Sequence, residues 1–129
     1  MKILFDTNVL ISAFMTGGTC YDIIDDSIEE HEPYYTDFVL DEVRRIFKNN
    51  FKYPNSTIEK LTSFITRRFI KGDTSDTLEK ISRDESDDQL LADASFNHID
   101  VIITGDKDLL ELKRYKDIKI IAPKDYGML

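Results

Sequence analysis

Short apolar runs alternate with segments of helical periodicity along most of the chain. Lys2–Phe5 and Val101–Thr104 are nearly continuous apolar runs, which is typical of strands buried on both faces of a parallel sheet. Pro33–Thr36 and Ile118–Ile121 predict further strands, and Thr77–Ile81 predicts a weaker one. Between these runs, apolar residues recur at intervals of three and four, as in amphipathic helices. The pattern predicts an α/β fold: a three-layer α/β/α sandwich with a mainly parallel central sheet.

Several of the predicted helices carry start or stop signals. Gly17 and Gly18 break the helical segment that follows the first strand. Ser56 and Ser86 each begin a capping-box pattern, in which a side chain three residues later reaches back to the cap. In the second pattern, Ser86 is the expected N-cap and Gln89 is the side chain that reaches back to it.

Length and composition favour one folded domain over residues 1–129. Hydrophobic residues make up 41 % of the chain and charged residues 33 %, which is the composition of a globular protein and not of a disordered one. The single cysteine, Cys20, excludes an intrachain disulfide. No apolar run is long enough to span a bilayer, and charge interrupts the first residues too early for a signal peptide. We therefore expect a cytoplasmic protein with no membrane partner.

A net charge of −8 runs against the usual basic character of proteins that bind nucleic acid. Two interpretations are compatible with it. The protein has no nucleic-acid partner, or several acidic side chains converge in one place where divalent cations offset them. The positions of the carboxylates decide between the two.

Four acidic residues are expected at one edge of the sheet. Ligands of open parallel sheets bind outside the carboxyl ends of the strands. Asp6 directly follows the first strand, and Asp106 follows the strand that ends at Thr104. Asp87 lies in the first turn of a predicted helix, where the helix dipole favours a negative charge. Glu42 lies early in the helix after the second strand, near the same edge if that strand runs parallel to the first.

Such a cluster predicts a metal site. Carboxylates a few ångströms apart raise one another's pKa, so their convergence is favourable only with cations between them. Carboxylate oxygens and water are hard ligands, which suit one or two ions of Mg²⁺ or Mn²⁺. Two such ions can hold the attacking and the leaving oxygen of a phosphodiester. We expect Asp6, Asp87 and Asp106 to ligate metal, and Glu42 to ligate a second ion or position water.

Each acid also has an ordinary structural alternative. Asp6 and Asp106 could serve as helix N-caps, and Asp87 could be a favourable charge in a first turn. Glu42 could be a solvated helix residue. These alternatives do not exclude metal binding, because a capping aspartate can also ligate an ion. The neighbouring Asp88 is an alternative to Asp87 as the inward acid.

Polar and basic residues near the same edge are secondary candidates. Some could orient a carboxylate or a bound water, with ordinary turn and cap chemistry as the alternative: Thr7, Asn8 and Thr104. Asp108 is expected either to support the site or to lie at the surface. The basic residues closest in sequence to the expected crevice are candidates for contacts with a phosphate backbone, although solvated helix faces explain most basic residues: Arg44, Arg45 and Lys107.

Four blocks of the sequence resemble the PIN-domain nucleases, and in particular the VapC-like toxins of prokaryotic toxin–antitoxin pairs. The blocks are residues 3–10, 40–43, 84–94 and 103–110, and they place Asp6, Glu42, Asp87 and Asp106 at the family's four acids. Glu85 replaces a proline that is common in the third block. The resemblance covers nearly the whole chain and implies Mg²⁺- or Mn²⁺-dependent hydrolysis of RNA, a homodimer and inhibition by an antitoxin partner.

The sequence thus predicts a metal-dependent endoribonuclease that leaves a 5′-phosphate and a 3′-hydroxyl, with the toxin of a toxin–antitoxin pair as its expected role. Two other functions remain compatible with the same residues. One is a binding or regulatory module that keeps the PIN fold without catalysis. The other is a metal-dependent nuclease that acts on structured DNA.

Overall fold

The computed structural model describes residues 1–129 and is built around a six-stranded sheet in the order β3-β2-β1-β4-β6-β5. All neighbouring strands are parallel except β5 and β6, which are antiparallel. The elements in chain order are β1 (Lys2–Phe5), α1 (Thr7–Thr16), α2 (Gly18–Glu30), β2 (Glu32–Tyr35), α3 (Asp37–Asn49), α4 (Asn55–Arg68), β3 (Ile70–Lys71), α5 (Glu85–Phe96), β4 (Val101–Ile103), α6 (Lys107–Leu112), β5 (Arg114–Tyr115), β6 (Ile118–Ile121) and the 3₁₀ helix η1 (Pro123–Met128).

The two strongest apolar runs of the sequence form the centre of the sheet. β1 pairs with β2 on one side and with β4 on the other, and Phe5 is the register partner of Ile103. The backbone N–H of Asp6 donates to the carbonyl of Ile103 at 2.9 Å, so the pairing continues one residue beyond β1. Residues 3–5 and 101–103 are buried, as expected of parallel strands covered on both faces. This pairing places Asp6, which follows β1, and Asp106, which follows β4, at the same edge of the sheet.

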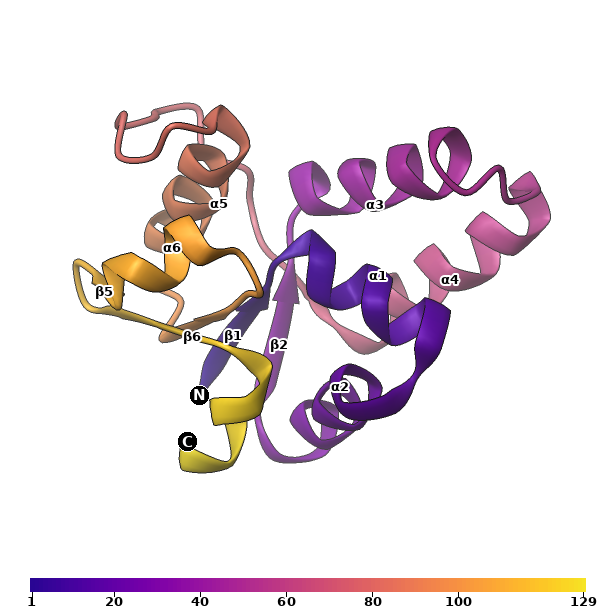
Figure 1. The fold of residues 1–129 in the computed structure, drawn as a ribbon, viewed down its shortest axis with the longest axis horizontal. Coiled ribbons are helices and arrows are strands. Elements are labelled where there is room, and N and C mark those ends of the chain that lie inside the picture. The colour runs from indigo at the N-terminus through magenta and orange to yellow at the C-terminus, as the bar shows by residue number, and fades with distance from the viewer.

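Helices cover both sides of the sheet, which confirms the predicted α/β/α layers. In Figure 1, α1 to α4 lie to the right of the strands, and α5 and α6 lie to the left. The buried apolar side chains of the strands and helices form one continuous core. No helix is both long enough and apolar enough to cross a membrane.

Some local predictions are wrong. Residues 77–81 do not form a strand. Side chains of α5 instead hold both ends of this segment: Asp93 accepts from the backbone N–H of Ser75, and Asp88 accepts from those of Ile81 and Ser82. The strands β3 and β5 were not predicted, because two residues are too few to show an apolar pattern.

Both expected capping boxes are also wrong. The N-cap of α4 is Pro54, whose carbonyl accepts the first helical N–H groups, and no side chain caps this end. The N-cap of α5 is Asp84, two residues before the expected Ser86. Gln89 does not reach back to a cap, because its amide donates instead to the Ser75 carbonyl and to Asp93, each within 3 Å.

Candidate active site

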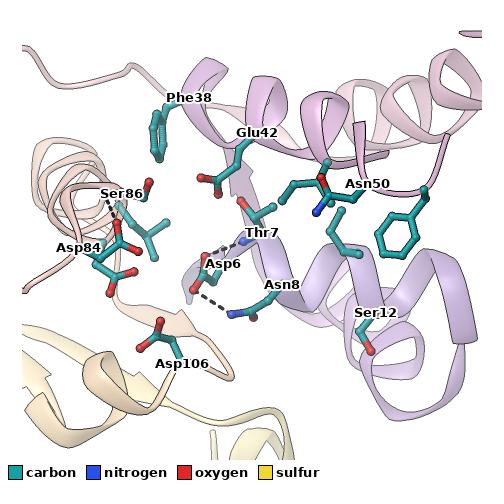
Figure 2. A pocket seen from close by; sticks show the side chains of 15 residues that line it. Asp6, Thr7, Asn8, Ser12, Phe38, Glu42, Asn50, Asp84, Ser86 and Asp106 are labelled. Carbon is teal, nitrogen blue, oxygen red and sulfur yellow. Dashed lines mark hydrogen bonds between the residues drawn. The ribbon is translucent and has the colours of Figure 1, made fainter. Parts of the chain in front are cut away.

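A cleft of about 420 Å³ opens at the carboxyl edge of the sheet. Its walls come from α1, α3 and the starts of α5 and α6. Figure 2 shows carboxylates from different elements turned toward this space. The four acids expected from the sequence line the cleft together with a fifth: Asp6, Glu42, Asp87, Asp106 and Asp84. The fold thus brings together acids that are up to 100 residues apart in the chain.

Asp6 lies where β1 becomes α1 and is the N-cap of that helix. Its Oδ1 accepts a hydrogen bond from the backbone N–H of Thr7 at 2.7 Å. Its Oδ2 accepts from the Thr104 hydroxyl at 2.7 Å and from the Asn8 side chain at 3.3 Å. Thr104 directly follows β4, so the pairing of the two central strands fixes the direction of the carboxylate. Asp6 therefore both caps α1 and lines the cleft.

The pKa of Asp6 is raised to about 6. Burial is the largest cause, because it disfavours the charged form, and the hydrogen bonds from Thr104 and Thr7 oppose it. The negative charges of Glu42 and Asp106 raise the pKa further. The side chain therefore resists ionisation, and a cation beside it would favour the charged form.

Asp106 is the N-cap of α6. Its Oδ1 accepts hydrogen bonds from the backbone N–H groups of Asp108 at 2.8 Å and Leu109 at 3.2 Å. Its own N–H donates to the Thr104 hydroxyl at 3.0 Å, so one threonine contacts both Asp6 and Asp106. No protein group donates to Oδ2, which leaves this oxygen for a ligand.

Asp87 lies in the first turn of α5 and is 6 % exposed. Its Oδ2 accepts a hydrogen bond from the Ser82 hydroxyl at 3.2 Å, and its Oδ1 has no partner in the protein. Burial raises the pKa of Asp87 to about 6, and the charges of Asp106, Asp84 and Asp6 add to this increase. The hydrogen bond from Ser82 opposes it. Asp87 and Asp6 thus experience the same crowding of negative charge from opposite walls.

Asp88 turns away from the cleft. Its Oδ1 accepts hydrogen bonds from the backbone N–H groups of Ile81 at 3.0 Å and Ser82 at 2.7 Å. It therefore holds the segment whose Ser82 hydroxyl contacts Asp87. Of the two neighbouring acids, Asp87 lines the cleft and Asp88 anchors the chain behind it.

Glu42 enters the cleft from α3, whose N-cap is Thr36. Its Oε2 lies 3.6 Å from the guanidinium of Arg45, one turn further along the helix. The Arg45 side chain is largely exposed, so water screens this pair and it contributes little to stability.

The basic residues expected at the site do not line the cleft. Arg44 pairs with Asp41 at 3.5 Å, Arg45 pairs with Glu42, and Lys107 is exposed in the first turn of α6. None of the 15 residues that line the cleft is Lys, Arg or His. A phosphate would therefore meet carboxylates and neutral side chains but no positive charge, unless cations came with it.

Asp108 also lies outside the cleft. It accepts two hydrogen bonds from the guanidinium of Arg83, at 2.8 and 2.9 Å. This pair joins the connection before α5 to the start of α6. Asp108 thus supports the outer rim of the cleft and does not enter it.

The sequence analysis missed several residues that line the cleft. Asp84 caps α5 by accepting from the Ser86 N–H at 2.9 Å, and its carboxylate faces the other acids (Figure 2). The false capping box at Ser86 concealed it. Asn50 and Phe51 directly follow α3; helical spacing in steps of four from Glu42 through Ile46 could have indicated Asn50, but nothing in the sequence indicated Phe51.

The donor set suits a hydrated divalent cation. In the structure, no group of three or more acidic, histidine or cysteine side chains is arranged to hold a metal ion. Mg²⁺ typically keeps several waters and binds through one or two carboxylates, so it does not need a cage of three. The Thr7 hydroxyl, in a residue that lines the cleft, is buried and has no hydrogen-bond partner in the protein. The residues therefore fit Mg²⁺ or Mn²⁺.

The family model of the PIN domain matches residues 2–108. The chain belongs to the PIN-domain family. The match spans β1 to the start of α6 and includes all five acids of the cleft. This confirms the resemblance that the four sequence blocks indicated, and it identifies the chain with a family of nucleases.

The PIN domain described here is also similar in fold to a solved structure. This structure is a chain in "Crystal structure of VapBC2 from Rickettsia felis bound to a DNA fragment from their promoter". The TM-score is 0.71 at 13 % sequence identity, and the alignment covers 95 % of this chain and 98 % of that chain. At this identity the likeness concerns the fold, which it confirms. No curated protein matches the sequence.

Proposed function

We propose that the chain is an endoribonuclease that depends on Mg²⁺ or Mn²⁺, and that it acts as the toxin of a toxin–antitoxin pair. The observation that carries the nuclease proposal is the cleft itself, in which five carboxylates meet with no positive side chain. A phosphodiester could enter it only with cations. Membership of the PIN-domain family supports hydrolysis of nucleic acid, and the likeness in fold to a chain of VapBC2 supports the toxin role.

We propose that Asp6, Asp87 and Asp106 hold the hydrated ion, directly or through its waters, with Glu42 as ligand of a second ion or as the group that positions water. The bound ion would supply charge neutralisation and polarisation of the phosphate. Thr104 orients Asp6 through its hydroxyl, and the first N–H groups of α6 orient Asp106. These hydrogen bonds hold the carboxylates in place before substrate arrives, which limits reorganisation during the reaction.

Asp84 extends this arrangement on the wall of α5. Its Oδ1 is used in capping the helix, so its second oxygen is the one available to the cleft. Ser82 holds the neighbouring Asp87 in position through its hydroxyl.

The direct test is cleavage of a mixed-sequence RNA with Mn²⁺ or Mg²⁺. We expect cleavage by the wild-type protein, with loss in EDTA and in Asp106→Asn, while a change at the exposed Asp117→Asn leaves cleavage intact. Equal cleavage in all samples would indicate a contaminating nuclease. Cleavage of structured DNA in preference to RNA would reassign the substrate.

Metal binding gives a second, separate measurement. Calorimetric titration with Mn²⁺ should show binding to the wild-type protein that Asp106→Asn weakens. A folded protein that binds no Mn²⁺ and cleaves nothing would be a binding module and not an enzyme.

The homodimer and the antitoxin partner are further proposals, and they rest on the family and on the fold. Light scattering that gives a single-chain mass in solution would reject the homodimer. Co-purification with the product of a small adjacent gene would support the antitoxin.

A further inference from the structure

The cleft continues beyond the acids along α1 and α3. Glu42, Ile46 and Asn50 are spaced by four residues and all line it, so one face of α3 forms this wall. Glu42 and Asn50 are separated by about 12 Å along the helix axis. On the opposite wall, α1 contributes Ile11 and Ser12. Figure 2 shows Asn50 and Ser12 on the side of the cleft away from Asp84 and Asp106.

A fixed aromatic side chain lies at this far end. Phe51 lines the cleft and is 39 % exposed. Its ring centroid lies 6.2 Å from that of Phe47 and 6.1 Å from that of Tyr53, and Phe47 is fully buried. These contacts hold the Phe51 ring, which reduces the entropy lost when a planar group packs against it.

The polar groups at this end have no partners within the protein. The side-chain amide of Asn50 makes no hydrogen bond, and neither does the Ser12 hydroxyl. Since the whole lining lacks a cation, this end does not suit an anionic group. It offers an aromatic face, two apolar side chains and free donors and acceptors, which together match an uncharged, planar, polar-edged group.

We propose that the far end of the cleft binds a nucleobase of the RNA, next to the phosphate that the acids bind. The base would stack on Phe51, and Asn50 would pair with its edge through one donor and one acceptor. The distance from Glu42 to Asn50 is one that a short stretch of ribose-phosphate backbone spans. The identification of the base as part of a substrate rests on the proposed nuclease function.

Stacking can be tested without metal or cleavage. The chain has six tyrosines but no tryptophan, so Phe51→Trp introduces a single tryptophan at the site, whose fluorescence can be excited selectively. We expect at least one of the four ribonucleosides to quench its fluorescence and free ribose not to, with weaker quenching after the further change Asn50→Ala. Phe96→Trp is the matched control, because Phe96 is exposed on α5 and does not line the cleft. Equal quenching at both positions would overturn the proposal.

The consequence for the substrate is measured with RNA. Phe51→Leu keeps an apolar side chain but removes the stacking face, and we expect it to raise KM by roughly 5- to 150-fold with a smaller change in kcat. If no nucleoside quenches Phe51→Trp and KM is unchanged in Phe51→Leu, the base site does not exist, while EDTA-sensitive cleavage would leave the nuclease proposal intact. Quenching by nucleosides without any RNA cleavage would support the base site and reject the nuclease. Quenching by an arginine-containing amphipathic peptide and by no nucleoside would assign this end to a protein partner and overturn the proposal.

Discussion

The cleft and the connection over residues 72–84 both contain contacts with buried carboxylates. The two regions differ in how many hydrogen bonds the protein donates to those carboxylates. Asp87 and Asp88 are neighbours and are almost equally exposed, at 6 % and 5 %. Asp88 accepts from two backbone N–H groups, whereas Asp87 accepts from one hydroxyl and has a free oxygen in the cleft. Burying a carboxylate is unfavourable unless donors or cations compensate it. Hydrogen-bond satisfaction, and not burial, therefore separates the anchoring acid from the acid that is available to a ligand.

The sharpest test of this comparison replaces each neighbour with its amide. Asp87→Asn removes the negative charge from the cleft, and we expect a loss of about 10²–10³-fold in kcat/KM for RNA, the range seen when one preorganised stabilising group is lost. Asp88→Asn keeps a carbonyl oxygen that can accept both N–H groups, so its activity should stay within a few-fold of wild type. Initial cleavage rates and Mn²⁺ titrations measure both effects. Similar losses in the two variants would contradict the division of roles.

The sequence predicted the cleft better than the connection, and for a physical reason. The runs that became β1 and β4 are apolar on both faces, so burial alone identifies them, and an acid directly after each strand must lie at the sheet edge. The connection has no such pattern. Three of its backbone N–H groups bond to Asp88 or Asp93, which follow it in the chain, so its own residues did not show how this segment is held.

The same reasoning explains why the sequence left Asp87 and Asp88 undecided. The contacts that distinguish the two acids are made with Ile81 and Ser82, which lie in the connection that has no pattern. The far end of the cleft was missed because Asn50 and Phe51 follow α3, where no expected strand end pointed to them.

Within the connection, the largest expected effect is on stability. Asp93 is fully buried and accepts hydrogen bonds at 2.8 Å from the Ser75 N–H, the Gln89 side chain and the Thr36 hydroxyl. Asp93→Ala leaves these donors unpaired and should reduce the free energy of unfolding by about 3 kcal/mol in urea denaturation. The exposed Asp117→Ala should change it by less than about 0.5 kcal/mol. Equal stability of the two variants would mean that the connection is not held in this way.

A smaller effect should appear in the pH dependence of stability without divalent ions. Because the folded state raises the pKa of Asp6 and Asp87 from 3.8 to about 6, it binds more protons than the unfolded state between these values. Stability contributed by these groups should therefore fall as the pH rises through this window. Asp6→Asn should flatten the decrease in thermal melts.

The matching control adds the cation. Mn²⁺ binds the ionised carboxylates, so it should raise the melting temperature of the wild-type protein at pH 7 and have little effect at pH 4. An increase of the same size at both values would show that the ion binds elsewhere.

The central position of β1 has a consequence for the order in which the protein can assemble during synthesis. β1 is synthesised nearly a hundred residues before β4, which is one of its two neighbours in the sheet. Closing so long a loop is slow and requires almost the complete chain. Until β4 is added, Asp6 lacks the Thr104 hydroxyl that orients it and Asp106 has no place opposite it, so a nascent chain does not yet contain the assembled acidic cleft.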